Sequence, residues 1–199
     1  MKRGDEKSID MPVFITSYSR QYPQVKKIIN KYLPVLYGDE SLWKLYNKGT
    51  YKCGSNRCVT CESLYVSSVF VSSSTGRAFD VNSYINCNTK FVVYLLNCSK
   101  CEIQYVGCIT RSLKCRMREH INQITSGSES TVVVSRHFLE CGRSDITKLK
   151  IQGIEKNEPS VRGGDLTAKL FHREAFWIFT LGTRQPVGLN LKFDITCCV

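Results

Sequence analysis

Long apolar runs are missing from this 199-residue chain. No stretch approaches the roughly 18 consecutive apolar residues that a membrane-spanning helix needs, so we expect no membrane partner. The first ten residues, MKRGDEKSID, are charged and contain no apolar segment, so we expect no secretory signal peptide. Internal repeats are absent as well, which excludes a repeat array.

Acidic side chains are also scarce. The chain has 17 Asp and Glu against 28 Lys and Arg, which gives a net charge of +11 and a pI near 9.2. Such a balance favours a polyanionic partner, because lysine and arginine neutralise phosphates and release counterions. We therefore expect DNA as the partner. The length suits one domain of ordinary size plus an appendage.

Cysteine, by contrast, is abundant. Eleven cysteines, an odd number that includes CxxC pairs, occur without a secretory signal, which indicates a reducing compartment and metal binding. We therefore expect an intracellular protein and, with DNA as its partner, a nuclear one. A disulfide-linked extracellular protein is the opposing hypothesis, and it predicts no zinc and few free thiols.

Residues 51–89 are predicted to form a small cysteine-rich zinc module with a β-hairpin. Three thiolates fall in one short run, Cys53, Cys58 and Cys61. Strands over Val66–Ser72 and Arg77–Val81 flank a turn signal at Ser74-Thr75-Gly76. This hairpin would return Cys87 toward Cys61. The expected site is thus an all-thiolate, tetrahedral Zn²⁺ site completed by Cys87.

A second CxxC pair is the rival source of zinc ligands. Cys98 and Cys101 can complete the site in place of Cys87, and they can also reach Cys141. A strand rises about 3.3 Å per residue, so the predicted strand Phe91–Asn97 should hold Cys87 and Cys98 well apart. One tetrahedral site cannot easily use both. Free buried cysteines are the plainest alternative.

Periodicity predicts an α+β fold downstream of this module. Strands are expected at Phe91–Asn97, Glu102–Gly107 and Leu149–Ile154, and helices from near Thr110, at Val132–Cys141 and at Asp165–Leu181. Thr110 or Ser112 can cap the first of these helices, and Asp165 the last. The expected core is a three-stranded antiparallel sheet flanked by helices.

Four side chains on this core suggest a phosphodiester site. The two predicted strands carry Tyr94 and Tyr105, and the first helix carries Arg116 and His120. Helical residues four apart share a face, so a guanidinium and an imidazole would project together beside two phenols. Arg116 can clamp a phosphate, and His120 can carry a proton or contact it.

Glu174 occupies an unusual position in the last predicted helix. The apolar residues around it form one stripe: Leu166, Leu170, Phe171, Trp177, Ile178 and Leu181. A buried carboxylate without a partner costs several kcal/mol, so Glu174 should face a cation or be protonated. That cation is either an arginine of the core or a single Mg²⁺ or Mn²⁺ ion held with waters and phosphate oxygens.

The chain resembles the GIY-YIG nuclease core over about residues 52–194. The two motifs of that family correspond to Val92-Val93-Tyr94 and Tyr105-Val106-Gly107, followed by the helix with its Arg and His. The glycine that names the first motif is Val92 here. The sequence around these motifs most resembles the endonuclease domain that ends Penelope-like retroelement proteins, where a cysteine-rich linker precedes VVYL.

The resemblance implies a metal-dependent DNA endonuclease over residues 90–199. In that family a helical Glu before an aromatic pair holds the metal, which matches Glu174 in HREAFWI. One of the tyrosines helps to activate water, and Arg116 and the metal offset the developing charge. Asn190 falls where the family places an Asn near the phosphate.

The resemblance also bears on the rest of the chain. Residues 1–50 would be a partly disordered, partly helical remnant of an upstream region, with a short amphipathic helix at Gln24–Leu33. A reverse transcriptase would precede it in a longer parent protein. The alternative function is a zinc-stabilised nucleic-acid-binding protein without catalysis, since the first motif departs from the family at Val92.

Overall fold

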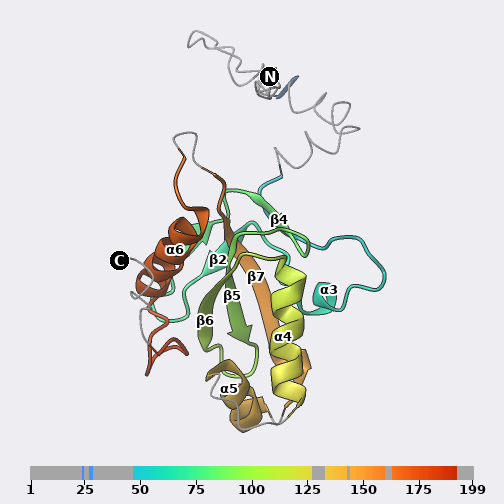
Figure 1. Ribbon diagram of the computed structural model, residues 1–199, viewed down its shortest axis with the longest axis vertical. Helices are drawn as coiled ribbons and strands as arrows, with labels where there is room; N and C mark the ends of the chain where they lie inside the picture. The colour runs from blue at the N-terminus through green and yellow to red at the C-terminus, as the bar shows by residue number, and fades with distance from the viewer. Residues whose placement is uncertain are drawn as a thin grey trace, which may run out of the picture. The chain divides into compact units, whose positions relative to one another are not determined.

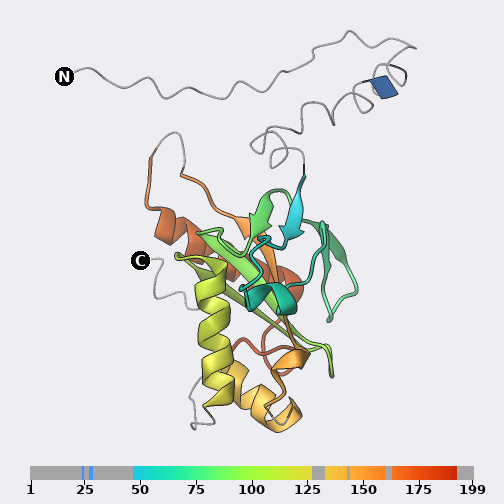
Figure 2. The same ribbon diagram turned by 90° about the vertical axis from the view of Figure 1, so that its right-hand side faces the viewer.

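The computed structural model describes Gln24, Lys27, Ile28 and the ranges 47–126, 133–142, 144–159 and 163–191. The chain divides into two compact units, Met1–Trp43 and Lys44–Val199. Most of the predicted helix Gln24–Leu33 lies outside the described residues. Within the described residues, no helix is long and apolar enough to span a membrane. The elements below all belong to the second unit (Figures 1 and 2).

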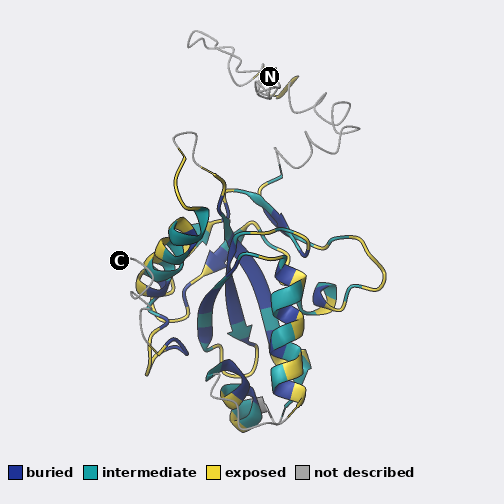
Figure 3. Ribbon diagram, in the orientation of Figure 1, coloured by how far each residue is buried: buried dark blue, intermediate teal, exposed yellow. Residues whose placement is uncertain are grey.

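A three-stranded antiparallel sheet forms the centre of this unit. Its strands are β5 (Val92–Cys98), β6 (Gln104–Ile109) and β7 (Leu149–Lys156), in the order β6-β5-β7. The prediction of three antiparallel strands is confirmed. β5 lies in the middle and six of its seven residues are buried, which explains why its sequence is a continuous apolar run (Figure 3).

Three helices accompany the sheet: α4 (Leu113–Thr125), α5 (Val133–Gly142) and α6 (Leu166–Leu181). Side chains alternate between the faces of a strand, so Tyr94 and its partner Gly107 share one face and Cys108 lies on the other. α4 reaches Tyr94 through His120, and α6 reaches Cys108 through Glu174. The edge strand β6 therefore lies between the two helices that carry the predicted site residues (Figure 1).

The two predicted helix caps have different outcomes. Asp165 caps α6 as expected, since its carboxylate accepts a hydrogen bond from the Thr167 amide at 2.8 Å. Ser112 stands at the cap position of α4 but makes no side-chain bond to the helix backbone, so the predicted side-chain cap is wrong. Its hydroxyl instead lies 3.0 Å from the Cys115 thiol.

The cysteine-rich segment packs on the sheet. It contains β1 (Gly49–Tyr51), α3 (Thr60–Ser63), β2 (Val69–Val71), β3 (Ala78–Asp80) and β4 (Tyr84–Asn86). The predicted hairpin is confirmed as the antiparallel pair β2-β3. A parallel pair, β1-β4, was not predicted. The Thr50 hydroxyl donates to the Gly153 carbonyl of β7 at 2.6 Å, so the segment shares the core of the sheet.

Candidate active site and metal centres

Tyr94 lies at the centre of the candidate active site. It is fully buried in the middle of β5, opposite Gly107 of β6. A Cβ atom at Gly107 would collide with the Tyr94 hydroxyl and with the Tyr105 ring. Glycine at this position therefore lets both phenols pass close to the backbone of β6, which gives a physical reason for the Tyr-Val-Gly motif.

The Tyr94 hydroxyl joins two side chains of α4. Arg116 Nε donates a hydrogen bond to Tyr94 Oη at 2.9 Å, and His120 Nε2 lies 3.0 Å from the same oxygen. Arg116 and His120 are one helical turn apart, as the sequence predicted. Because the phenol oxygen accepts from Arg116, its own hydrogen is available to His120. The structure thus brings three of the predicted site residues into direct contact.

The environment disfavours ionisation of both phenols. The pKa of Tyr94 is raised well above its usual value, mainly by burial and next by the neighbouring Tyr105 phenol. Arg116 acts in the opposite sense. The pKa of Tyr105 is raised by burial and then by the charge of Glu174, and Arg116 again lowers it. A further positive charge at this place would make either phenolate easier to form.

His120 is placed behind Tyr94 and not on a surface open to a phosphate. Its side chain is 0% exposed, so the expected direct phosphate contact is not what this structure offers. Burial, followed by the charge of Arg116, lowers the pKa of His120 to about 3, which leaves the imidazole neutral at pH 7. Its role here is to hold the Tyr94 hydroxyl.

Arg116 keeps part of its surface open. Its side chain is 26% exposed, and its Nη1 also binds Glu119 Oε2 at 3.1 Å. This pairing with Tyr94 on one side and Glu119 on the other fixes the direction of the guanidinium. Its pKa is raised by the Tyr94 phenol against the opposing effect of burial, so the group stays charged.

Glu174 is less buried than its position in the stripe predicted. Leu170, Ile178 and Leu181 of the same helix ridge are buried, whereas Glu174 is only half-buried. Beside β6, Cys108 donates its thiol hydrogen to Glu174 Oε2 at 3.3 Å. The bidentate arginine–carboxylate pair of α6 is formed instead by Arg173 with Glu155, at 2.7 and 2.8 Å.

Asn190 does not point its amide at the site. Its Nδ2 donates to the Val106 carbonyl at 2.8 Å, and its Oδ1 accepts from the Val106 amide at 3.0 Å. The side chain thereby replaces a missing strand partner on the edge of β6. Both polar atoms of the amide are bonded to the backbone of Val106, and the contact of Asn190 with a phosphate stays a prediction.

Four thiols converge in the cysteine-rich segment, namely those of Cys53, Cys58, Cys61 and Cys87. Their sulfur atoms all lie within 4.8 Å of one another, with Cys61 Sγ 3.6 Å from Cys53 Sγ and 3.5 Å from Cys87 Sγ. Zn–S bonds of roughly 2.3 Å in a tetrahedron require S···S distances of roughly 3.8 Å. The geometry therefore fits an all-thiolate zinc site with Cys87 as the fourth ligand.

The rival cysteine pair belongs to a second cluster of Cys98, Cys101, His137 and Cys141. Cys101 Sγ lies 3.4 Å from His137 Nε2. Burial lowers the pKa of His137, which favours the neutral imidazole that binds metals. The sequence reasoning missed His137. Its signal was present, because Cys98-x2-Cys101 followed by His137-x3-Cys141 has the spacing of zinc ligands.

Comparison with known proteins gives two structural neighbours. No protein-family model matches the chain, and neither does any curated protein. The catalytic domain of the homing endonuclease I-TevI is 19% identical over 51% of this chain and 97% of its own, with a TM-score of 0.39. A point mutant of the catalytic domain of the intron endonuclease I-TevI is 19% identical over 50% and 91%, also with a TM-score of 0.39.

Proposed function

We propose that this chain is a metal-dependent endonuclease of the GIY-YIG type that nicks DNA by hydrolysing phosphodiester bonds. The observation that carries the proposal is the Tyr94 hydroxyl, held at 2.9 Å by Arg116 and at 3.0 Å by His120. The charge of Glu174 lies near enough to raise the pKa of Tyr94 and Tyr105. A fixed cation, two phenols and a carboxylate whose charge acts on both phenols suit phosphoryl chemistry.

Arg116 supplies the fixed positive charge in this proposal. Its partly exposed guanidinium is oriented by Tyr94 and Glu119 before any substrate arrives. Donors that need no reorientation stabilise charge developing on a phosphate oxygen more strongly than mobile ones. Removal of one such donor typically costs about a hundredfold to a thousandfold in rate.

Tyr105 is the better candidate for the group that takes a proton from the attacking water. It is partly exposed, whereas Tyr94 is completely buried. Burial and the charge of Glu174 raise the pKa of Tyr105, Arg116 acts in the opposite sense, and a bound metal cation would favour the phenolate further. Tyr94 then acts as a positioning residue that ties Arg116 and His120 to the sheet.

Glu174 is the residue that would hold Mg²⁺ or Mn²⁺. It offers a half-buried carboxylate, and hard cations prefer oxygen ligands of this kind. A cation bound there would offset negative charge on the phosphate and would lower the pKa of neighbouring phenols.

The two cysteine clusters are proposed as structural zinc sites. The first joins the loop 53–61 to the end of β4, and the second joins the β5-β6 turn to α5. With the motif pattern, they support a retroelement-derived endonuclease closest to that of Penelope-like proteins. Such a protein would act in the nucleus and follow a reverse transcriptase in a longer parent chain.

A zinc-stabilised nucleic-acid-binding protein without catalysis is the second candidate. The complete burial of Tyr94 and His120 favours it, because neither can touch a substrate in this structure. In that case the cluster around Tyr94 would only stabilise the sheet.

Nicking of supercoiled plasmid with Mg²⁺ separates the two candidates. We expect Glu174→Ala and Arg116→Ala each to lower the nicking rate by about a hundredfold or more. The control is Glu158→Ala, which removes a carboxylate that is 68% exposed and paired with Lys156. Wild-type protein that binds the plasmid without nicking it would establish the second candidate.

A further inference from the structure

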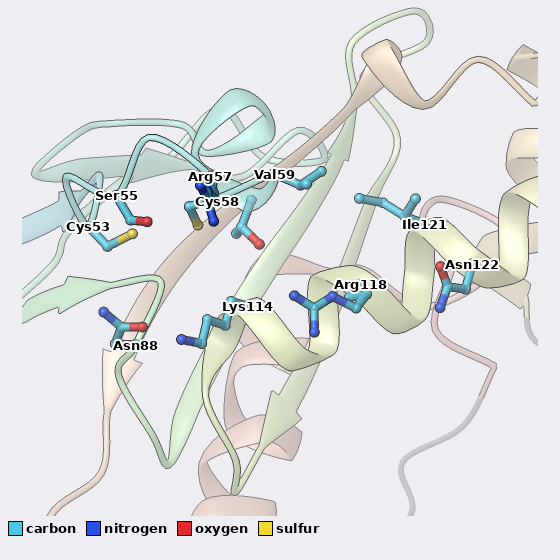
Figure 4. Close-up of a pocket in the computed structure, with 11 residues that line it drawn as sticks. Cys53, Ser55, Arg57, Cys58, Val59, Asn88, Lys114, Arg118, Ile121 and Asn122 are labelled. Atoms are coloured by element: carbon cyan, nitrogen blue, oxygen red, sulfur yellow. The ribbon is translucent and has the colours of Figure 1, made fainter.

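A cleft of about 470 Å³ lies on the side of α4 that faces the cysteine-rich segment (Figure 4). One wall is the loop 53–60, which carries Arg57. The other wall is α4, from which Lys114 and Arg118 project toward that loop, and Asn88 lies at one end. This cleft takes no part in the site around Tyr94.

All the charged side chains that line the cleft are positive. Arg57, Lys114 and Arg118 all line it and all are exposed, whereas no Asp or Glu lines it. In the part of the chain that the structure describes, none of the three forms an ion pair. Other cations of the domain differ, since Arg116 and Arg173 are each bound to a carboxylate.

The polar groups that accompany these cations suit an anion with many oxygens. Asn88 and Asn122 bring amide N–H donors to the two ends of the cleft, and Ser55 brings a hydroxyl. Lys114 and Arg118 stand four residues apart on one helix face, an arrangement of like charges that weakens a helix slightly. A ligand that neutralises both would remove this repulsion. The spread of cations over two walls favours a chain of phosphates over a single small anion.

The cleft and the candidate active site lie on opposite sides of α4. Arg118 and Arg116 are two residues apart, which turns them about 200° from each other around the helix axis. A helix with its side chains is about 10 Å or more across. A phosphate in the cleft is therefore remote from the one beside Arg116 and belongs to another part of the same nucleic acid.

The first cysteine cluster shapes one wall of the cleft. Cys53 and Cys58 line the cleft, and the same two residues contribute thiols to the four-cysteine cluster. A zinc ion bound there would fix the loop between them, including Arg57. The metal would then act on nucleic-acid binding through the position of that loop.

We propose that this cleft is a second binding site of the protein, for the phosphodiester backbone of a nucleic acid, and that the four-cysteine cluster organises it. The proposal rests on the proposed function, because it assigns a remote segment of the same substrate to the cleft. Backbone contact implies binding that depends on salt and not on base sequence.

The test measures equilibrium binding of the full chain to fluorescent duplexes of two unrelated sequences over a range of KCl concentrations. The parent protein and every variant carry Glu174→Gln so that the duplex stays intact. The triple variant Arg57→Gln/Lys114→Gln/Arg118→Gln is compared with Arg77→Gln/Lys150→Gln/Lys169→Gln, which removes the same charge elsewhere. Each lost phosphate contact lowers the slope of log K against log salt by about 0.9 for a duplex.

We expect the cleft triple to lower that slope by about 2 to 3 and the affinity at fixed salt by about tenfold or more, for both sequences. The control triple should change the slope by less than about 1. A cleft triple that binds like the parent, or equal losses in the two triples, overturns the proposal. Cys87→Ser should weaken binding in the same direction.

Two further readouts keep the result specific. Arg57→Lys/Lys114→Arg/Arg118→Lys preserves the charges and should preserve the slope, so a loss in this variant also overturns the proposal. Plasmid nicking is measured separately with the Glu174 side chain intact. Nicking with an unchanged salt slope in the cleft triple contradicts the cleft alone, whereas cleft-dependent binding without nicking contradicts only the endonuclease.

Discussion

The two sides of α4 carry the same kinds of basic residue in different surroundings. Toward the sheet, Arg116 is bonded to a buried phenol and to a carboxylate. Toward the cysteine-rich segment, Lys114 and Arg118 are exposed and line a cleft without acidic groups. The neighbours, not the residue type, decide the role: the inner arginine is fixed in direction, and the outer cations are free to follow a flexible polyanion.

Exchange of arginine for lysine should show the difference between the two sides of α4 most clearly. Arg116→Lys cannot reproduce the Nε bond to Tyr94, because an ammonium lacks the planar fork. We expect its nicking rate on saturating plasmid to fall by about a hundredfold. Arg118→Lys keeps the charge, so the salt slope of duplex binding should stay within about 0.5 of the wild-type slope. Equal sensitivity of the two sites in their own assays would remove the distinction.

The pH dependence of stability tests the burial of the inner side. The pKa of His120 is lowered in the fold from 6.5 to about 3, so between these values the unfolded chain binds a proton that the folded chain does not. Stability from this source is complete above about pH 6.5 and is lost as the pH falls toward 3. We expect a loss on the order of 2 kcal/mol between pH 6.5 and 5, measured by urea unfolding.

The matched variants for this measurement are His120→Asn and His172→Asn. His120→Asn should flatten the pH dependence, although it lowers stability at pH 7 by removing the bond to Tyr94. His172 is exposed on α6 and should leave the pH dependence as it is. A slope that survives in His120→Asn would mean that other groups carry it.

The smallest effect is expected on the free energy of unfolding, when the first turns of α4 and α6 are compared. Asp165→Ala removes a side-chain cap and should cost about 1 kcal/mol in the free energy of unfolding. Ser112→Ala removes no cap bond and should cost less than about 0.5 kcal/mol. Urea unfolding of the two variants checks this, and equal losses would show that Ser112 caps α4 in solution.

Local sequence patterns predicted the secondary-structure elements more successfully than they predicted how these elements pair and pack. The apolar run of β5, the turn signal between β2 and β3 and the cap at Asp165 each depend on neighbouring residues, and the structure contains all three. β1 and β4 were missed because strands of three residues are too short to show a period and because, unlike β2 and β3, they pair in parallel and flank no shared turn. Their pairing joins segments far apart in the chain.

The candidate site was predicted as a set of residues but not as a geometry. Spacing placed Arg116 and His120 on one face, and the structure places both at Tyr94. Sequence could not show that His120 would be fully buried, that Glu174 would be only half-buried beside Cys108, or that Asn190 would be used by the backbone of Val106. Each depends on contacts between residues more than 20 positions apart.

By itself the sequence determined the central strand, the helix faces and the cysteines able to gather around a metal, because those follow from periodicity and spacing along the chain. The sequence favoured Cys87 for the first cluster, but the tertiary structure alone showed that His137 joins Cys98, Cys101 and Cys141 in a second one. Only the tertiary structure also placed Arg57 across a cleft from Lys114 and Arg118. The physical reason is that ligands and charges act over a few ångströms, and only packing brings distant segments that close.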